Sequence, residues 1–86
     1  AGPPVDVFAL GVILFLALTG RLPYPGETAA QVLTAQLEVR HGRRPRPSLE
    51  GAPGDVDPAV LRACEAALAL EPSRRPAAAR LARTLQ

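Results

Sequence analysis

The 86-residue sequence predicts a small all-α domain of about four helices. Apolar residues recur at helical spacing in several segments, and breaks rich in Gly and Pro separate these segments. Residues that commonly begin helices, such as Asp, Thr and Pro, stand at the starts of the segments. No segment shows the clean alternation of apolar and polar residues that is typical of a half-buried strand.

The first expected helix runs over residues 6–18 and is apolar on all sides. Asp6 suits its N-cap, because its side chain can accept a backbone hydrogen bond and its charge complements the helix dipole. The apolar run over residues 7–19 has 13 residues, whereas a membrane span needs about 20. A short helix that is apolar on every side is usually buried in a core. This helix therefore predicts a core larger than the present chain can build, and a far side that is exposed when the chain is alone.

The second expected helix, residues 28–40, follows a break rich in Gly and Pro. Thr28 and Gln31 have the spacing of a capping box. Three apolar residues line one face of this helix at helical spacing: Val32, Leu33 and Leu37. Residues 41–56 are dominated by Pro, Gly and charge, and they are expected to form a loop.

The third expected helix covers residues 57–70, with Asp57 as its N-cap and Pro58 at its first helical position. The fourth covers residues 76–86. The third helix is expected to bury a stripe of Val60, Leu61, Cys64 and Leu68. The fourth carries Leu81 and Leu85 on one face.

Composition excludes several classes of function. One Cys and one His allow neither a disulfide within the chain nor a structural zinc site built from it alone. A net charge of +2 is too small to imply nucleic-acid binding. Every basic residue is Arg, which together with the Ala, Pro and Gly content indicates GC-rich coding and a bacterial source. No secretory signal is present, because Asp6 rather than a basic region precedes the apolar run, and we expect a cytoplasmic protein without a membrane segment.

Few residues suggest chemistry of their own. The chain has no Gly-rich phosphate loop, and His41 lies in a basic loop without a nucleophile beside it. Cys64 is expected to be a small buried hydrophobe. The arginines of residues 40–46 could contact phosphate or an acidic partner, or could form a solvated loop. We therefore expect no catalytic residue, no metal site and no cofactor within this chain.

Two short patterns are more specific. The first is "DVFALGVIL", residues 6–14, followed by "LTGRLPYPG", residues 18–26, and the second is "LALEPSRRP", residues 68–76. In this order and separation they resemble the late C-lobe of a protein kinase domain, of the eukaryotic-like Ser/Thr kinases found in bacteria. The matching residues are Asp6, Phe8, Ala9, Gly11, Gly20, Pro23, Tyr24, Gly26, Leu68, Pro72, Arg75 and Pro76. The resemblance covers essentially all of residues 1–86 and implies a fragment of the α+β protein-kinase-like fold.

The resemblance also implies roles for four residues. Asp6 would anchor the catalytic loop by accepting its backbone N–H groups, a role suited to a carboxylate at a helix mouth. Ile13 and Ala17 would support the side-chain stack beneath the adenine ring. Arg75 would form a buried ion pair with a Glu that lies upstream of the chain. The alternatives are a plain N-cap for Asp6 and an exposed position near a helix start for Arg75.

The resemblance implies a parent protein that phosphorylates Ser/Thr in proteins with ATP and Mg²⁺. The chain itself has no Lys, no Asn, no H-R-D and no D-F-G, so it lacks the residues that phosphoryl transfer needs. Its expected contribution is a scaffold and a substrate-docking surface on the second helix. Its expected partners are the missing N-lobe and catalytic portion, and the protein substrate.

Two other hypotheses remain open. The chain could be a free-standing all-α interaction module, with a groove formed by Phe8, Leu14 and Phe15. It could also be a kinase remnant without function.

Overall fold

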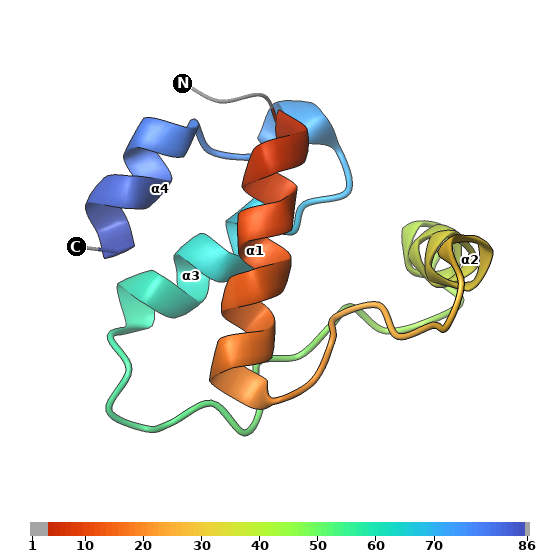
Figure 1. Ribbon diagram of the computed structural model, residues 1–86, viewed down its shortest axis with the longest axis horizontal. Helices are drawn as coiled ribbons and strands as arrows, with labels where there is room; N and C mark the ends of the chain where they lie inside the picture. Colours follow the sequence, from red (N-terminus) through yellow and green to blue (C-terminus); the bar gives the residue numbers. More distant parts are fainter. Residues whose placement is uncertain (1–3, 86) are drawn as a thin grey trace.

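The computed structural model describes residues 4–85, which form four α-helices and one 3₁₀ turn and contain no strand. The elements are α1 (Pro4–Thr19), α2 (Ala29–Arg40), α3 (Pro58–Ala67), η1 (Pro72–Arg74) and α4 (Ala78–Leu85). The all-α prediction with four helices is confirmed. In Figure 1, α1 is the central helix, α3 and α4 pack on one side of it, and α2 stands apart.

The first helix begins earlier than predicted. α1 starts at Pro4, so Asp6 lies in its first turn and is not its N-cap. A proline is well suited to the first turn of a helix, because its missing N–H would have no partner there and its φ is already helical. The helix ends at Thr19, and Gly20 follows with a φ of 73°. A residue in the left-handed conformation commonly terminates a helix, and glycine adopts this conformation without steric cost.

The second helix begins as predicted, but its apolar face is not buried. The Thr28 hydroxyl accepts a hydrogen bond from the Gln31 backbone N–H at 3.2 Å, which confirms the cap. Leu33 is 56% exposed and Leu37 is 43% exposed, whereas Ala35 is buried. The leucines remain exposed because α2 stands apart from the other helices and offers them no apolar surface to pack on.

The third helix is shorter than predicted. It has the expected N-cap, because the Asp57 carboxylate accepts a hydrogen bond from the Ala59 N–H at 2.9 Å. It ends at Ala67, three residues before the predicted end. The carbonyls of Ala69 and Leu70 take no part in helical hydrogen bonds, and they accept hydrogen bonds from the Arg75 side chain instead.

The last helix starts at Ala78, two residues later than predicted. Arg75 has extended backbone angles, φ −77° and ψ 143°, and Pro76 follows it. A residue before proline is pushed away from the helical region, which delays the helix start. Gln86, the last residue of the predicted helix, lies outside the described residues.

The core consists of two small clusters along one side of α1. Val7, Ala67 and Leu81 form one cluster, and Phe15, Cys64 and Leu68 form the other. The predicted buried positions Cys64 and Leu68 are thus confirmed. Val60 and Leu61 of the same predicted stripe are only half-buried, because no other helix covers the start of α3 completely. In α4, Leu81 is buried and Leu85 is 44% exposed.

Gly11 allows the close crossing of α1 and α3. A Cβ atom at Gly11 would lie 2.9 Å from the Cβ of Ala67, closer than real carbon contacts allow. The thiol of Cys64 also donates to the Gly11 carbonyl, with 3.6 Å between sulfur and oxygen. A small residue at each side of the crossing therefore sets which side of α1 is covered by α3.

The loop predicted for residues 41–56 is confirmed, since no helix or strand lies within it. The middle of this loop is attached to the segment that follows α1, because Arg21 Nη2 donates to the Glu50 carbonyl at 2.6 Å. Among residues 4–85, no helix combines the length and the apolar character that crossing a membrane requires.

Candidate functional site

The outward side of α1 is a large exposed apolar surface. Val5 is 67% exposed, Ile13 is 64% exposed, and Leu10 and Leu16 are each close to half exposed. We call this surface the outer α1 face and define it by its exposed members: Val5, Asp6, Ala9, Leu10, Ile13, Leu16 and Ala17. The prediction that the far side of this helix is exposed is confirmed. Contiguous apolar patches of this kind mark binding surfaces or sites of aggregation.

The structure brings three of the predicted site residues together on this face. Asp6, Ile13 and Ala17 are all exposed on the outer α1 face, with Asp6 about two helical turns before Ile13. Within residues 4–85, the Asp6 carboxylate makes no hydrogen bond or ion pair. A carboxylate in the first turn of a helix, beside an exposed apolar stripe, is available to accept hydrogen bonds from another segment.

Arg75 lies on the other side of α1, in a half-buried position. Its Nε atom donates to the Ala69 carbonyl at 2.7 Å, and its Nη2 atom lies 3.5 Å from the Leu70 carbonyl oxygen. The guanidinium carbon is 4.7 Å from the centroid of the Phe8 ring, a cation–π distance. The alternative of an exposed Arg75 therefore does not match the structure, and the side chain ties the α3–η1 connection to α1.

The groove expected for an interaction module is absent from its predicted place. Phe15 is only 2% exposed and belongs to the core. Phe8 and Leu14 are half-buried and pack against the cluster that contains Phe15. The Phe8 ring also stacks on Tyr24, with 6.4 Å between ring centroids. This prediction is wrong because the aromatic side of α1 is the side that α3 covers.

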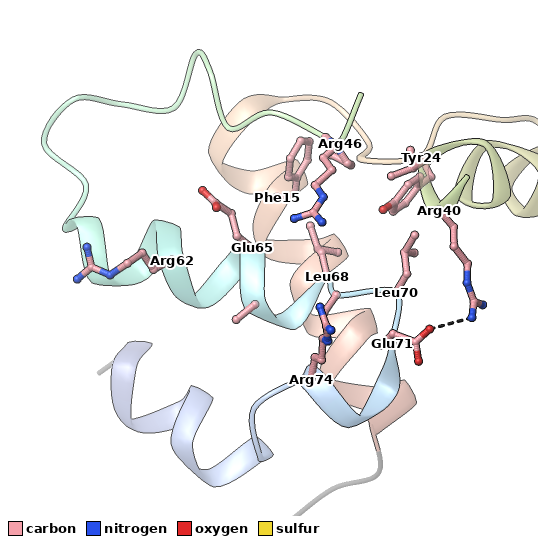
Figure 2. Close-up of a pocket in the computed structure, with 14 residues that line it drawn as sticks. Phe15, Tyr24, Arg40, Arg46, Arg62, Glu65, Leu68, Leu70, Glu71 and Arg74 are labelled. Carbon is pink, nitrogen blue, oxygen red and sulfur yellow. Dashed lines mark hydrogen bonds and ion pairs between the residues drawn. The ribbon is translucent and has the colours of Figure 1, made fainter. Parts of the chain in front are cut away.

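A second candidate site, which the sequence patterns did not reveal, is a cavity of about 560 Å³ between α2, the 41–56 loop, α3 and η1. We call it the α2–α3 pocket, and Figure 2 shows its lining. Its main apolar lining residues are Phe15, Tyr24, Val39, Pro47, Leu68 and Leu70. Its charged lining residues are Arg40, Arg46, Arg62, Glu65, Glu71 and Arg74.

The charges of the α2–α3 pocket are only partly compensated. Arg40 Nη2 lies 2.8 Å from Glu71 Oε1 and joins α2 to the start of η1 (Figure 2). The other three arginines of the lining form no ion pair within the described residues. Burial raises the pKa of Tyr24, and the positive charge of Arg46 opposes that rise in pKa. Arg46 and Tyr24 line the same pocket.

Cys64 does not add a nucleophile. The residue is fully buried, and burial followed by the charge of Glu65 raises the pKa of its thiol from 9.0 to about 11. The thiol is thus protonated near neutral pH, and thiols react as thiolates. The prediction of a small buried hydrophobe is confirmed. Among residues 4–85, no group of three or more His, Cys, Asp or Glu could hold a metal ion.

Comparison with known proteins shows a distant relation to serine/threonine protein kinases. The chain is 38% identical over 60 residues to serine/threonine-protein kinase PrkC of Bacillus subtilis, covering 67% of this chain and 9% of PrkC. It is 36% identical over 77 residues to PknK of Mycobacterium tuberculosis, covering 90% of this chain and 7% of PknK. It is 46% identical over 74 residues to Pkn1 of Myxococcus xanthus, covering 81% of this chain and 9% of Pkn1.

The chain thus spans less than a tenth of the length of these relatives. No family profile matches it. No solved structure gives a significant match. The relation to serine/threonine protein kinases, many of them bacterial, confirms the resemblance in its general form.

Proposed function

We propose that this chain is a late C-lobe portion of a bacterial serine/threonine protein kinase, which phosphorylates proteins with ATP and Mg²⁺ in the cytoplasm. The outer α1 face is the observation that carries the proposal. A helix that is central to a larger domain needs an apolar surface on the side away from α3, and α1 has one. The kinase relation over 60–77 residues supports the same assignment.

In this proposal the outer α1 face contacts the rest of the kinase. Asp6 anchors the catalytic loop by accepting its backbone N–H groups, and these charge-assisted bonds are among the stronger hydrogen bonds in proteins. Ile13 and Ala17 support the stack beneath the adenine ring. The remaining portion of the kinase supplies the nucleotide and Mg²⁺ ligands, because the present chain has neither Lys nor Asn.

The other proposed roles fall on Arg75 and α2. Arg75 pairs with a carboxylate supplied by the upstream portion of the kinase. A planar guanidinium group suits a bidentate contact with a carboxylate better than a lysine ammonium does. α2 serves as a docking surface for a protein substrate, which its separation from the other helices and its exposed Leu33 and Leu37 support.

The coding DNA immediately upstream provides the first test. An open reading frame that encodes H-R-D, D-F-G and A-P-E motifs would support the proposal. The restored protein should then phosphorylate a Ser/Thr peptide library with ATP and Mg²⁺. A start codon with its own ribosome-binding site at residue 1 would contradict the proposal, and a restored protein without phosphorylation activity would indicate a remnant.

The outer α1 face also favours a second candidate, a free-standing interaction module. Such a module would bind its partner with this face rather than with the buried Phe8 and Phe15 side. Both candidates expose the outer α1 face in the isolated chain, so the test is the cooperativity of unfolding. A module should unfold in one sharp cooperative transition, whereas a portion of a larger lobe should be loosely packed and unfold gradually.

A further inference from the structure

The α2–α3 pocket has a size that suits a small ligand, and this feature is separate from the proposed kinase role. Its volume of about 560 Å³ lies within the range of about 300–1,000 Å³ that is typical of small-molecule sites. Val39, Pro47 and Leu70 are half-buried on its walls. A ligand with an apolar body would remove their remaining exposed surface from water, which favours binding.

The charges around the pocket favour an anion. Four arginines and two glutamates line it, an excess of two positive charges. The ion pair between Arg40 and Glu71 neutralises one charge of each sign. Figure 2 shows Arg46 reaching into the pocket from the 41–56 loop, Arg74 on the η1 side, and Arg62 at the far end of α3. Arg46, Arg62 and Arg74 all lack an ion-pair partner within the described residues. Because Arg62 lies at the far end of α3, Arg46 and Arg74 are the two cations best placed to meet an acid group.

We propose that the α2–α3 pocket binds a small organic anion, a molecule with one carboxylate or phosphate group on a compact apolar body. The acid group accepts hydrogen bonds from Arg46 and Arg74, whose guanidinium groups suit both kinds of anion. The apolar body packs on the half-buried walls between α2 and α3. Because α2 has few contacts with the other helices, a ligand at this place would also join α2 to them.

Tyr24 provides a reporter within the pocket. It is the only tyrosine of a chain that has no tryptophan, so tyrosine fluorescence arises there alone. We would titrate the 86-residue chain with cyclohexylacetate, with cyclohexyl phosphate and with the neutral 2-cyclohexylethanol. None of the three absorbs where tyrosine is excited. The expected result is a saturable fluorescence change for at least one anion, with a dissociation constant of about 1 mM or tighter. The alcohol should bind at least about fivefold more weakly, because it lacks the charge-assisted contacts.

Three variants test the role of the arginines. Arg46→Gln and Arg74→Gln should each weaken binding of the anion by about threefold or more and leave binding of the alcohol unchanged. Arg43→Gln is the matched control, because it removes the same charge from the same loop as Arg46 but does not line the pocket. Measurements at about 0.15 M salt screen long-range effects of net charge, so this control should bind as the original chain does.

Three results would overturn the proposal. The first is the absence of a saturable change at Tyr24 for both anions up to about 10 mM, well above the expected dissociation constant. The second is equal affinity for the anions and the alcohol. The third is a loss in Arg43→Gln as large as that in the two pocket variants. Circular dichroism identifies any variant that has lost helical structure. Whether the pocket prefers an anion is decided on the original chain, by comparing the affinities for the anions and for the alcohol.

Discussion

The outer α1 face leads to a prediction about how the isolated chain behaves in solution. Its four large apolar side chains, which are 44–67% exposed, leave roughly 350 Å² of apolar surface in water, within the size range in which an exposed patch is often an interaction surface. At about 25 cal/mol per Å², covering this surface completely corresponds to roughly 9 kcal/mol before the costs of association. We therefore expect the 86-residue chain to be helical but to self-associate and to bind a hydrophobic dye.

The perturbation is the double substitution Ile13→Gln with Leu16→Gln. Both side chains are exposed and lie outside the two core clusters, so removing them should change the free energy of unfolding by less than about 0.5 kcal/mol for each site. Glutamine is a good helix former, so α1 should persist. Dye binding and self-association should fall, because about half of the exposed apolar surface of the patch becomes polar.

The assays are dye fluorescence, sedimentation velocity and circular dichroism on the same samples. The matched control is Leu33→Gln with Leu37→Gln, which replaces two leucines of similar exposure, 56% and 43%, on α2. If the α2 pair abolishes association and the α1 pair does not, the outer α1 face is not the surface responsible. A wild-type chain that is monomeric and binds no dye would refute the reasoning as a whole. A sharp cooperative unfolding transition would favour the interaction module over a portion of a larger lobe.

Four further predictions concern nucleotide binding and single residues. Isothermal titration should show no binding of ATP·Mg²⁺ tighter than about 1 mM to the 86-residue chain, because it lacks the phosphate and metal ligands. In a restored kinase, Asp6→Asn should lower the single-turnover phosphorylation rate by roughly a hundredfold if Asp6 positions the catalytic loop. If Asp6 only complements the helix dipole, the substitution should leave that rate unchanged and cost about 0.3–1 kcal/mol of stability. Arg75→Ala in that kinase should cost about 3–5 kcal/mol of stability if it breaks a buried ion pair, and an unchanged melting temperature would contradict this role. Burial raises the pKa of Cys64 from 9.0 to about 11, so as pH rises the thiol ionises in the unfolded chain before it ionises in the folded chain. The free energy of unfolding should therefore fall as pH rises from about 9 to about 11. Circular dichroism should show a smaller loss of stability over this pH range in Cys64→Ala.

Local signals determined where several helices begin. Thr28 accepts its hydrogen bond from Gln31, and Asp57 caps the helix that starts at Pro58, as their spacing predicted. These starts depend on contacts within three residues of the chain, so they can be read from sequence. The first helix departed from this rule, because Pro4 began it two residues before the better capping residue Asp6.

Tertiary contacts decided where the third helix ends. Local periodicity continued to residue 70, but the helix stops at Ala67. Arg75 binds the carbonyls of Ala69 and Leu70, and this contact holds the following segment in a non-helical turn. The turn also sets the entry to the last helix, which begins at Ala78.

The sequence by itself determined the helical class, most helix starts and the relation to kinases, whereas only the tertiary structure decided which surfaces are buried. α1 is apolar on every side, so its periodicity carries no information about the side that faces the core. That choice depends on Gly11, which admits Ala67 and α3 on one side and leaves Ile13 exposed on the other. The α2–α3 pocket likewise joins segments far apart in the chain, such as Arg46 and Arg74. Hydrogen bonds at helix starts join near neighbours, but burial depends on which distant segments meet, and no local pattern encodes that.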